Sequence, residues 1–381
     1  MVSTAKSFPF PLRESAKTSD HAWTATNAYI LDEFHFVRML RVERNRTERS
    51  GKPFMLMLLN GDGIFQRSEV LGDIVSAVAS STRETDTLGW YETGSVIGIL
   101  FTELGTTDRD VIAKIVNKVS SALEEQLGYD DAEEVTITHH LFPEDVGSKG
   151  KHETDIRLYP DLERMAAKKK GAQALKRVLD VIGSLAAIIG FSPIFVAVAA
   201  AIKLTSKGPV LFRQKRIGQY GKQFTFLKFR SMKANNDPKI HEEYVKKLIA
   251  GRDDIKQKDG KDGSFKLVND PRVTSVGRFI RRTSIDELPQ FFNVLMGDMS
   301  LVGPRPPVPY EYQAYDVWHR RRVIEVRPGI TGLWQVKGRS KTTFDEMVRL
   351  DLQYAQSWTV ATDVKILLQT PKAVLSGSGA Y

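Results

Sequence analysis

Apolar and polar positions follow two rhythms in the first third of the chain. Three short apolar runs, PFMLMLLN, SVIGILF and EVTITHHLF, have the length of β-strands, and the first ends at a turn-forming Asn60-Gly61 pair. Between these runs, apolar residues recur every three to four positions, as on one face of a helix. The pattern predicts a small α+β domain over residues 30–144, after an N-terminal tail, residues 1–29.

The first predicted helix of this domain covers LDEFHFVRMLRVERNRTERSGK and has about five turns. We place Phe34, Val37, Leu40 and Val42 on its apolar face. The helix should end at Gly51, because glycine readily adopts the left-handed conformation that closes many helices. Two more helices are predicted, around residues 69–81 and 107–127.

An uncharged run from Val181 to Ile202 is apolar around its whole circumference. Since about 20 helical residues cross the hydrocarbon layer of a bilayer, the run predicts a membrane segment, which we place at residues 178–203. Pro193 cannot donate to the carbonyl four residues back, so a bend is predicted there, and the Ser192 hydroxyl can bind a freed carbonyl. Replacing Pro193 by Ala is then expected to straighten the helix.

Basic residues flank both ends of this run, and such residues favour the cytoplasmic side of a membrane. They are Lys168, Lys169, Lys170, Lys176 and Arg177 before it, and Lys203 and Lys207 after it. A helix that enters, bends at Ser192-Pro193 and leaves by the same face satisfies both groups. A straight crossing and a buried core helix are the alternatives.

Composition narrows the partners and the compartment. The 381 residues carry a formal net charge of +9, which suits anionic lipids, nucleotides or nucleic acid. The absence of cysteine excludes disulfide frameworks and thiolate zinc sites. Residues 1–29 lack an apolar run of signal-peptide length, so we expect the N-terminal domain on the cytoplasmic side. The polar stretch 145–173 predicts a linker to a second domain, residues 174–381. Within that domain, the polar residues 234–266 predict a mobile surface excursion.

Adjacent Asp286 and Glu287 lie in the densest chemistry of the chain, DPRVTSVGRFIRRTSIDELPQFFNVLMGDMSLVGPRPP. By themselves they can be a helix cap, since Ser284 and Glu287 have the spacing of a capping box and acidic first turns complement the helix dipole. Such a helix would open at the pair. Its apolar face would carry Leu288, Phe291, Phe292 and Leu295.

Four arginines surround this pair in the sequence: Arg278, Arg281, Arg282 and Arg305. Guanidinium groups can bind a diphosphate by bidentate hydrogen bonds. Their charge would also keep Asp286 ionised, as a nucleophile or a metal ligand must be. A surface ion-pair network is the structural alternative.

Four motifs in the second domain carry a specific resemblance. LKFRSMK at 227–233, TSIDELPQ at 283–290, LVGPRP at 301–306 and RPGITGLWQV at 327–336 resemble the successive signatures of bacterial sugar transferases, the monotopic polyprenyl-phosphate phosphoglycosyl transferases. The likeness runs from about Lys176 to Tyr381, and the ending resembles members that serve exopolysaccharide synthesis. It implies a mostly helical domain with a re-entrant membrane hairpin at the cytoplasmic face of the bacterial inner membrane.

The resemblance also implies a reaction and its residues. Asp286 would attack the β-phosphate of a UDP-sugar and release UMP, and Glu287 would help polyprenyl (undecaprenyl) phosphate to take up the phosphosugar. Mg²⁺ would sit against Asp286 and the diphosphate. Arg281 and Arg305 match phosphate and nucleotide contacts of the family, and Arg230 and Asp351 are weaker candidates for substrate binding. The sequence does not identify the sugar, and it leaves a homo-oligomer open.

The first domain resembles the nucleotide-cyclase-type palm of diguanylate cyclases around RETDTLGWYETGSVIGILF. Active cyclases have two glycines and two acidic residues in the turn that here reads YETGS, so the resemblance implies a degenerate domain with a regulatory or assembly role. An alternative function is a membrane-tethered signalling protein that binds a cyclic dinucleotide and has no transferase activity. Nucleic acid is not an expected partner, because no recognisable binding motif is present.

Two smaller features complete the predictions. His139-His140 lie in a strand pattern without matching ligands nearby in the sequence, so no metal site is expected there. A set of large apolar residues fits either a lipid-facing surface or an ordinary core: Trp334, Trp358, Phe344, Met347 and Val348.

Overall fold

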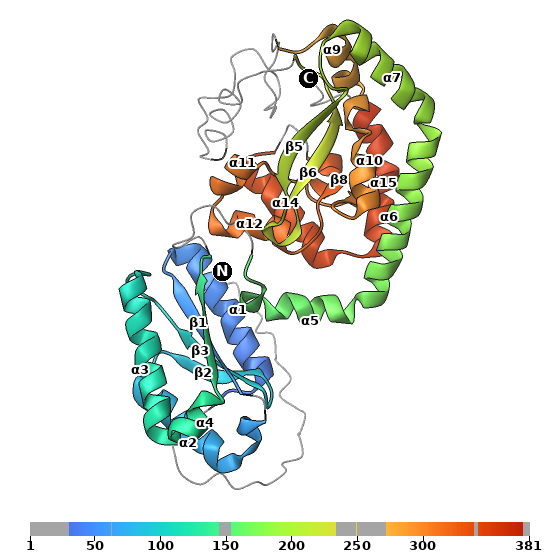
Figure 1. The fold of residues 1–381 in the computed structure, drawn as a ribbon. Helices are drawn as coiled ribbons and strands as arrows, with labels where there is room; N and C mark the ends of the chain where they lie inside the picture. Colours follow the sequence, from blue (N-terminus) through green and yellow to red (C-terminus); the bar gives the residue numbers. More distant parts are fainter. Residues whose placement is uncertain are drawn as a thin grey trace, which may run out of the picture.

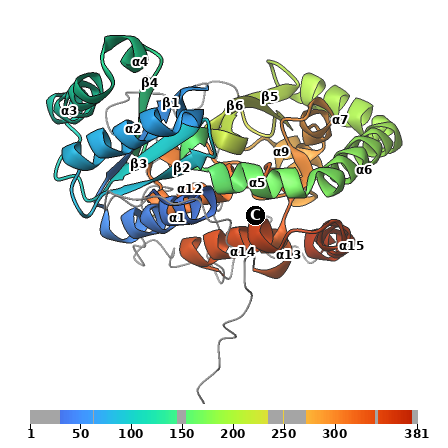
Figure 2. The ribbon, with the colours of Figure 1, turned by 90° about the horizontal axis from the view of Figure 1, so that it is seen from below.

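The computed structural model describes residues 30–61, 63–144, 154–233, 249, 272–338 and 342–375. An N-terminal domain and a C-terminal domain are joined by helix α5 (Pro160–Lys168), which leaves the first domain beside α1 and continues into α6 (Figures 1 and 2). The tail, residues 1–29, lies outside the described residues. So does the surface excursion predicted for residues 234–266, except residue 249. The predicted linker is helical where it forms α5.

The N-terminal domain follows the predicted order of helix, strand, helix, paired strands, helix and strand. Its elements are α1 (Glu33–Ser50), β1 (Phe54–Asn60), the 3-10 turn η1 (Ile64–Gln66), α2 (Ser68–Ser81), β2 (Thr87–Glu92), β3 (Val96–Phe101), α3 (Arg109–Leu127), α4 (Tyr129–Glu133) and β4 (Thr136–Phe142). The four strands form one antiparallel sheet in the order β2-β3-β1-β4.

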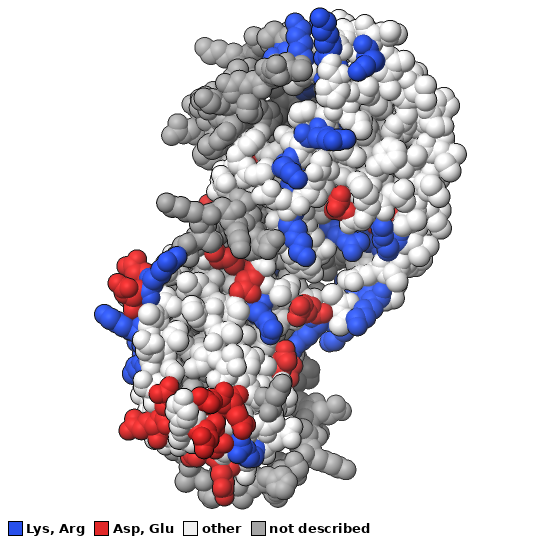
Figure 3. Space-filling model, in the orientation of Figure 1, with Lys and Arg blue, Asp and Glu red and all other residues white. Residues whose placement is uncertain are grey.

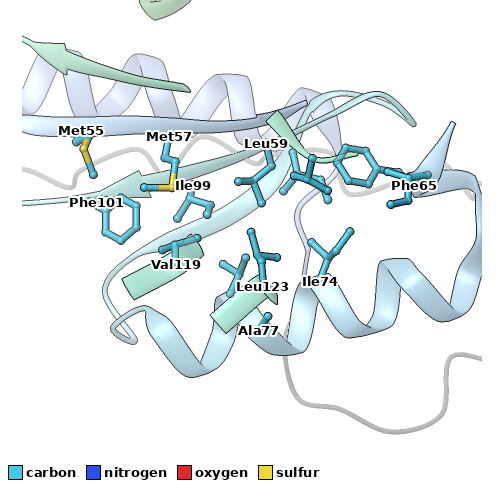
Figure 4. Packing of buried hydrophobic residues seen from close by; sticks show 14 of the residues in the cluster. Met55, Met57, Leu59, Phe65, Ile74, Ala77, Ile99, Phe101, Val119 and Leu123 are labelled. Carbon is cyan, nitrogen blue, oxygen red and sulfur yellow. The ribbon is translucent and has the colours of Figure 1, made fainter. Parts of the chain in front are cut away.

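The central strand β1 is buried on both faces, which explains its continuous apolar sequence. Met55, Met57 and Leu59 pack with residues of α2 and α3, such as Ile74 and Val119 (Figure 4). The alternate residues of β1 pack with α1, because successive strand side chains point to opposite faces. Helices therefore cover both sides of the sheet.

Helix α1 ends as predicted, because Gly51 has φ 71° and donates its N–H to the Thr47 carbonyl. The predicted apolar face was partly wrong. Val37 and Leu40 are buried as expected, but Phe34 and Val42 are 67% and 41% exposed, and the neighbouring Phe36 is fully buried. The reason is a slot made by two neighbouring strands. A Cβ built at Gly98 would come within 2.4 Å of the Phe36 ring, so the sheet accepts this ring only where it carries glycine.

The C-terminal domain packs helices around two small sheets. Its described elements are α6 (Lys170–Gly190), α7 (Ser192–Thr205), β5 (Leu211–Ile217), η3 (Gln219–Gly221), β6 (Gln223–Phe229), α9 (Ser275–Arg282), η5 (Ile285–Glu287), α10 (Gln290–Met296), β7 (Ser300–Val302), α11 (Pro309–Gln313), α12 (Val317–Ile324), β8 (Gly329–Thr331), α13 (Leu333–Lys337), α14 (Phe344–Ser357) and α15 (Val360–Leu375), while η2 (Ile156–Leu158) precedes α5. Strands β5 and β6 pair antiparallel, and β7 and β8 pair parallel. The five large apolar residues in question, on and next to α13 and α14, are all buried, which confirms the core interpretation: Trp334, Trp358, Phe344, Met347 and Val348.

The bend predicted at Ser192-Pro193 is confirmed. Helices α6 and α7 meet at 59°, and the Ser192 Oγ donates to the Ile189 carbonyl at 2.7 Å. Ile189 lies four residues before Pro193, so the hydroxyl binds the carbonyl that the proline cannot. Taken one at a time, none of the described helices is long and apolar enough to cross a bilayer, and α6 and α7 meet that criterion only as a bent pair.

The bent pair has an apolar outer surface. Ile182, Ile189 and Val196 are 61%, 64% and 70% exposed, whereas Val198 and Ile202 on the inner side are buried. Figure 3 shows that this rim, over α6 and α7, is almost free of charged side chains. An uncharged exposed surface of this kind marks an interaction site for protein or lipid.

Candidate functional site

The acidic pair lies in a tight turn and not in a helix cap. Asp286 and Glu287 belong to the 3-10 turn η5, and α10 begins only at Gln290, after Pro289. Ser284 has φ 59°, a left-handed conformation that is uncommon for serine, and its side chain makes no cap hydrogen bond. The capping-box alternative is therefore excluded, and the prediction of a helix that opens at the pair is wrong. Proline lacks the N–H that a helix interior needs, which places the helix start after it.

The two carboxylates have different surroundings. Asp286 is 8% exposed, whereas Glu287 is half-buried and forms an ion pair with Lys228, with 2.7 Å between Oε1 and Nζ. Lys228 lies on β6, 59 residues earlier in the chain, and its role was not predicted. The turn thus presents one enclosed carboxylate beside one that is held by a lysine.

The Gly-Pro-Arg-Pro-Pro segment forms a loop whose backbone is fixed by its surroundings. Its three prolines cannot donate backbone hydrogen bonds, so the loop depends on donors from elsewhere. Four successive carbonyls each accept one: Pro304 from the Gly329 N–H at 2.8 Å, Arg305 from Arg322 Nη2 at 3.2 Å, Pro306 from Arg216 Nη1 at 2.7 Å and Pro307 from the Ile217 N–H at 2.9 Å. Within the described stretch 301–308 every residue except Arg305 is buried. The loop therefore presents the Arg305 side chain from a rigid backbone.

Glycines explain why two of the sequence motifs lie together. Gly303 and Gly329 meet backbone to backbone next to the parallel pair β7 and β8. A Cβ built at Gly329 would come within 2.0 Å of the Gly303 nitrogen, so neither position accepts a side chain without moving the loop. The RPGITG segment is therefore a support for the Arg305 loop.

Arg216 is a site residue that sequence reasoning missed. Its side chain is buried, donates from Nε to Gln214 at 3.0 Å, and stacks 5.0 Å from the centre of the Phe226 ring. Burial lowers the pKa of Arg216 to about 10, the nearby Arg305 charge acts in the same direction, and Glu311 and Glu287 oppose it. Arg216 therefore lies within electrostatic reach of both the Arg305 loop and the acidic pair, and it stays charged at neutral pH. Its only sequence signal was one arginine in an alternating strand.

The other predicted arginines fall into two groups. Arg281 is half-buried in the last turn of α9, directly before η5, whereas Arg278 and Arg282 are exposed. Arg230 is buried and donates to the carbonyls of Ser206 and Lys207, at the end of α7. The structure thus places Arg281 beside the acidic turn and gives Arg230 a partner in the scaffold.

Asp351 also has a partner in the scaffold. It forms an ion pair with Arg322, with 2.6 Å between Oδ2 and Nη2 and each side chain 2% exposed. Arg322 is the residue that holds the Arg305 carbonyl. Asp351 therefore bears on the site through Arg322 and the loop.

The first half of α6 is held by hydrogen bonds to segments on both sides of the site. Asp180 accepts from the Ser300 hydroxyl at 3.0 Å and from the Leu301 N–H at 2.9 Å, just before the Arg305 loop. Arg177 donates to the carbonyls of Val294 and Leu295 at the end of α10, which follows the acidic turn. The bent helix pair and the site therefore form one packed unit.

The acidic pair suits magnesium only with help from another molecule. Among the described residues, no group of three or more Asp, Glu or His side chains is placed to hold a metal ion. Mg²⁺ commonly binds to one or two carboxylates together with water and substrate phosphates. The carboxylate of Asp286, next to that of Glu287, fits this kind of site.

Comparisons with known proteins agree on the C-terminal domain. The model of the bacterial sugar transferase family matches residues 171–377. The chain is 45% identical over 206 residues to a galactosyl transferase, CpsE, of Streptococcus agalactiae, and 44% identical over 215 residues to an undecaprenyl-phosphate galactose phosphotransferase of Salmonella typhimurium. It is 38% identical over 206 residues to an exopolysaccharide production protein, ExoY, of Sinorhizobium fredii.

These matches cover about half of the chain, from 54% to 56% of its residues. They span 43% of the Streptococcus and Salmonella proteins, which are much longer than the matched region, and 88% of the Sinorhizobium protein.

The N-terminal domain resembles solved structures only loosely. A diguanylate cyclase protein from Thermotoga maritima is 17% identical, with a TM-score of 0.26, over 31% of this chain and 86% of its own. The cyclase-like character of residues 30–144 therefore stays a prediction from the sequence. By contrast, the match over residues 171–377 takes in the acidic turn, the Arg305 loop and the bent helix pair. The chain belongs to the bacterial sugar transferase family.

Proposed function

We propose that this chain transfers a sugar phosphate from a UDP-sugar to polyprenyl (undecaprenyl) phosphate, with release of UMP, at the cytoplasmic face of the bacterial inner membrane. The observation that carries the proposal is the enclosed carboxylate of Asp286, next to the Glu287–Lys228 ion pair. The rigid Arg305 loop and the buried Arg216 supply positive charge nearby. The names of relatives, such as the Salmonella undecaprenyl-phosphate galactose phosphotransferase, support this substrate class.

In the first step, a carboxylate oxygen of Asp286 attacks the β-phosphorus of the UDP-sugar. The bond from this phosphorus to the bridging oxygen breaks, UMP leaves with the electron pair, and the sugar phosphate remains on the aspartate as an acyl phosphate. Arg305, Arg281 and Arg216 would stabilise the charge that develops on the phosphate oxygens, because fixed cations in an enclosed site act more strongly than in water. The carboxylate is a modest nucleophile, so this charge neutralisation is essential.

In the second step, a phosphate oxygen of the polyprenyl phosphate attacks the same phosphorus. The bond to Asp286 breaks, the carboxylate is restored, and the product is a polyprenyl diphosphate sugar. Glu287 would accept the proton of a monoprotonated polyprenyl phosphate, and its ion pair with Lys228 would hold the carboxylate in place. Asp286 would also hold Mg²⁺, whose charge, when it is bound, neutralises part of the diphosphate charge.

The bent helix pair would bring this site to the lipid acceptor. We propose that α6 and α7 enter the bilayer and leave by the same face, with their exposed apolar side chains in the hydrocarbon. The far end of the N-terminal domain, around α4, is rich in acidic side chains (Figure 3). Because the anionic cytoplasmic leaflet repels acidic surfaces, this distribution favours an orientation in which α6 and α7 face the bilayer and the acidic end of the N-terminal domain points away from it. The N-terminal domain would serve regulation or assembly.

Mass spectrometry after incubation with a panel of UDP-sugars and magnesium, without lipid acceptor, tests the proposal. The wild-type chain should carry a phosphosugar on the peptide that contains Asp286, and UMP should be released once per chain. Asp286→Asn should abolish both, because the amide keeps the shape but loses the charge. Glu287→Gln should still form the adduct but turn over poorly. Asp298→Asn, which removes one charge from the same segment, is the matched control.

Full turnover by Asp286→Asn, with kinetics that require both substrates before UMP leaves, would refute the covalent mechanism. Binding of a cyclic dinucleotide, without UMP release for any sugar in the panel, would favour the signalling alternative.

A further inference from the structure

Helix α12 contacts both domains through neighbouring residues. Arg321 faces α1 of the N-terminal domain, where its Nη1 lies 3.5 Å from Glu48 Oε2 and 3.4 Å from Asn45 Oδ1. Ile324, one turn on, is buried in a cluster with Phe36 and other residues of the N-terminal domain. This end of α12 is therefore held by α1.

The next residue, Arg322, faces a different side of the helix, because successive side chains on a helix point about 100° apart. It is buried in the C-terminal domain, where it pairs with Asp351 at 2.6 Å and donates to the Tyr315 hydroxyl at 3.0 Å. The same guanidinium donates to the Arg305 carbonyl at 3.2 Å. Two consecutive residues thus connect the N-terminal domain to the loop that presents Arg305.

A helix as short as α12, with eight residues, depends on tertiary contacts for its position. Its beginning is fixed inside the C-terminal domain by His319. There Nδ1 accepts from the Asp316 N–H at 3.1 Å, and Nε2 lies 3.2 Å from Asp345 Oδ1. Its end is fixed by Arg321 and Ile324 against α1. The position of Arg322, between the two, therefore depends on both domains.

We propose that α12 is a positioning helix, through which the docked N-terminal domain sets the Arg305 loop for binding of the nucleotide sugar. Arg321, Glu48 and Arg322 are positioning residues in this scheme. The inference rests on the proposed function, since it takes Arg305 as a ligand of the diphosphate. Small displacements of a binding group weaken an interaction that depends on geometry, so loosening the far end of α12 reduces affinity for the UDP group without removing a substrate contact.

Glu48→Gln in the full-length chain is the sharpest test, because it leaves Arg321 with its second partner, Glu325. The KM for the UDP-sugar and the Kd for UDP should each rise at least about fivefold, the lower end of ordinary coupling between sites, while kcat changes little. Arg321→Gln should have the same effect, and the double variant should be no worse than either single one. Arg321→Lys should restore much of the affinity.

The matched control breaks a different ion pair of α1, one that it forms with the connecting helix α5 and not with α12. Asp161 of α5 forms an ion pair with Arg44 of α1, with 2.6 Å between Oδ1 and Nη2, and this ion pair does not involve α12. Asp161→Asn should leave both the KM and the Kd unchanged. An equal rise in Asp161→Asn and Glu48→Gln would show general loosening of the domains and would overturn the inference, as would an unchanged Kd in all variants.

The Kd for UDP separates this inference from the proposed function. If UDP binding follows the predicted pattern but no transfer occurs with any sugar, the proposed reaction is wrong and the positioning role of α12 is supported. If transfer occurs and the Kd is the same in every variant, the reaction stands and the positioning role is wrong.

Discussion

The bend between α6 and α7 is held by local and by tertiary interactions, and their magnitudes predict the outcome of Pro193→Ala. Proline inside a helix is about 3 kcal/mol less favourable than alanine, so the substitution favours one straight helix by up to this amount. The Ser192 hydroxyl at 2.7 Å from the Ile189 carbonyl already recovers about 1 kcal/mol. The local gain from straightening is therefore about 2 to 3 kcal/mol.

Tertiary contacts oppose straightening. The bend brings aromatic rings on and beside α7 against the rest of the domain, at centroid distances of 6.5 Å for Phe191 and Phe291, 5.5 Å for Phe195 and Phe229, and 5.8 Å for Phe195 and Phe292. Such pairs contribute about 0.5 to 1.5 kcal/mol each beyond area burial. The buried side chains of Val198 and Ile202 add about 1.5 to 3 kcal/mol each. Because these terms exceed the local gain, Pro193→Ala alone should keep the bend, contrary to the expectation from sequence.

Adding Phe195→Ala, Val198→Ala and Ile202→Ala removes two of the three ring contacts and most of the burial term. The remaining ring contact, about 0.5 to 1.5 kcal/mol, is smaller than the local gain, so this combined variant should straighten. Single cysteines at Lys170 and Lys207, treated with an impermeant reagent in sealed vesicles, report the topology. Labelling from one side is expected for the parent and for Pro193→Ala, and labelling from opposite sides for the combined variant that carries Pro193→Ala, Phe195→Ala, Val198→Ala and Ile202→Ala. Pro193→Ala with Val196→Ala, which trims an exposed side chain, is the control. Opposite-side labelling with Pro193→Ala alone would refute the energetic comparison.

Three further predictions follow from the site and its supports. Arg216→Met should lower kcat/KM for the UDP-sugar by about 100-fold, the size of a lost charge-assisted contact of about 3 kcal/mol, and Arg216→Lys should restore only part of it in steady-state assays. Burial lowers the pKa of His319 below 6.5, against the opposing effect of Asp316 and Asp345, so the unfolded chain binds a proton that the folded chain does not. Stability should therefore fall as the pH drops below 6.5, by up to about 1.4 kcal/mol per pH unit, and thermal melts of His319→Gln should lack this slope. Removal of residues 1–145 should leave UMP release measurable, and the isolated domain should make no cyclic dinucleotide from GTP.

The local features of the fold could be predicted from the sequence, because they depend on residues a few positions apart. The end of α1 at Gly51, the buried strand β1 and the bend at Ser192-Pro193 are of this kind. The acidic pair and Arg305 could be singled out by residue type, and the match to the bacterial sugar transferase family confirmed that resemblance. The pattern could not show that Ser284 is left-handed, so the capping box stayed open as an alternative until the structure excluded it.

Only the tertiary structure decided which partners complete the site. Lys228 reaches Glu287 across 59 residues, and Arg216 reaches the Pro306 carbonyl across 90. The sequence pattern around a lysine or arginine on a strand does not predict its distant partner, because helical and strand periodicities describe one element at a time. The same limit applies to the buried face of α1, because Phe36 is buried only where strand β3 carries a glycine, Gly98. The sequence determined the elements and the chemical groups, and long-range packing determined which groups meet.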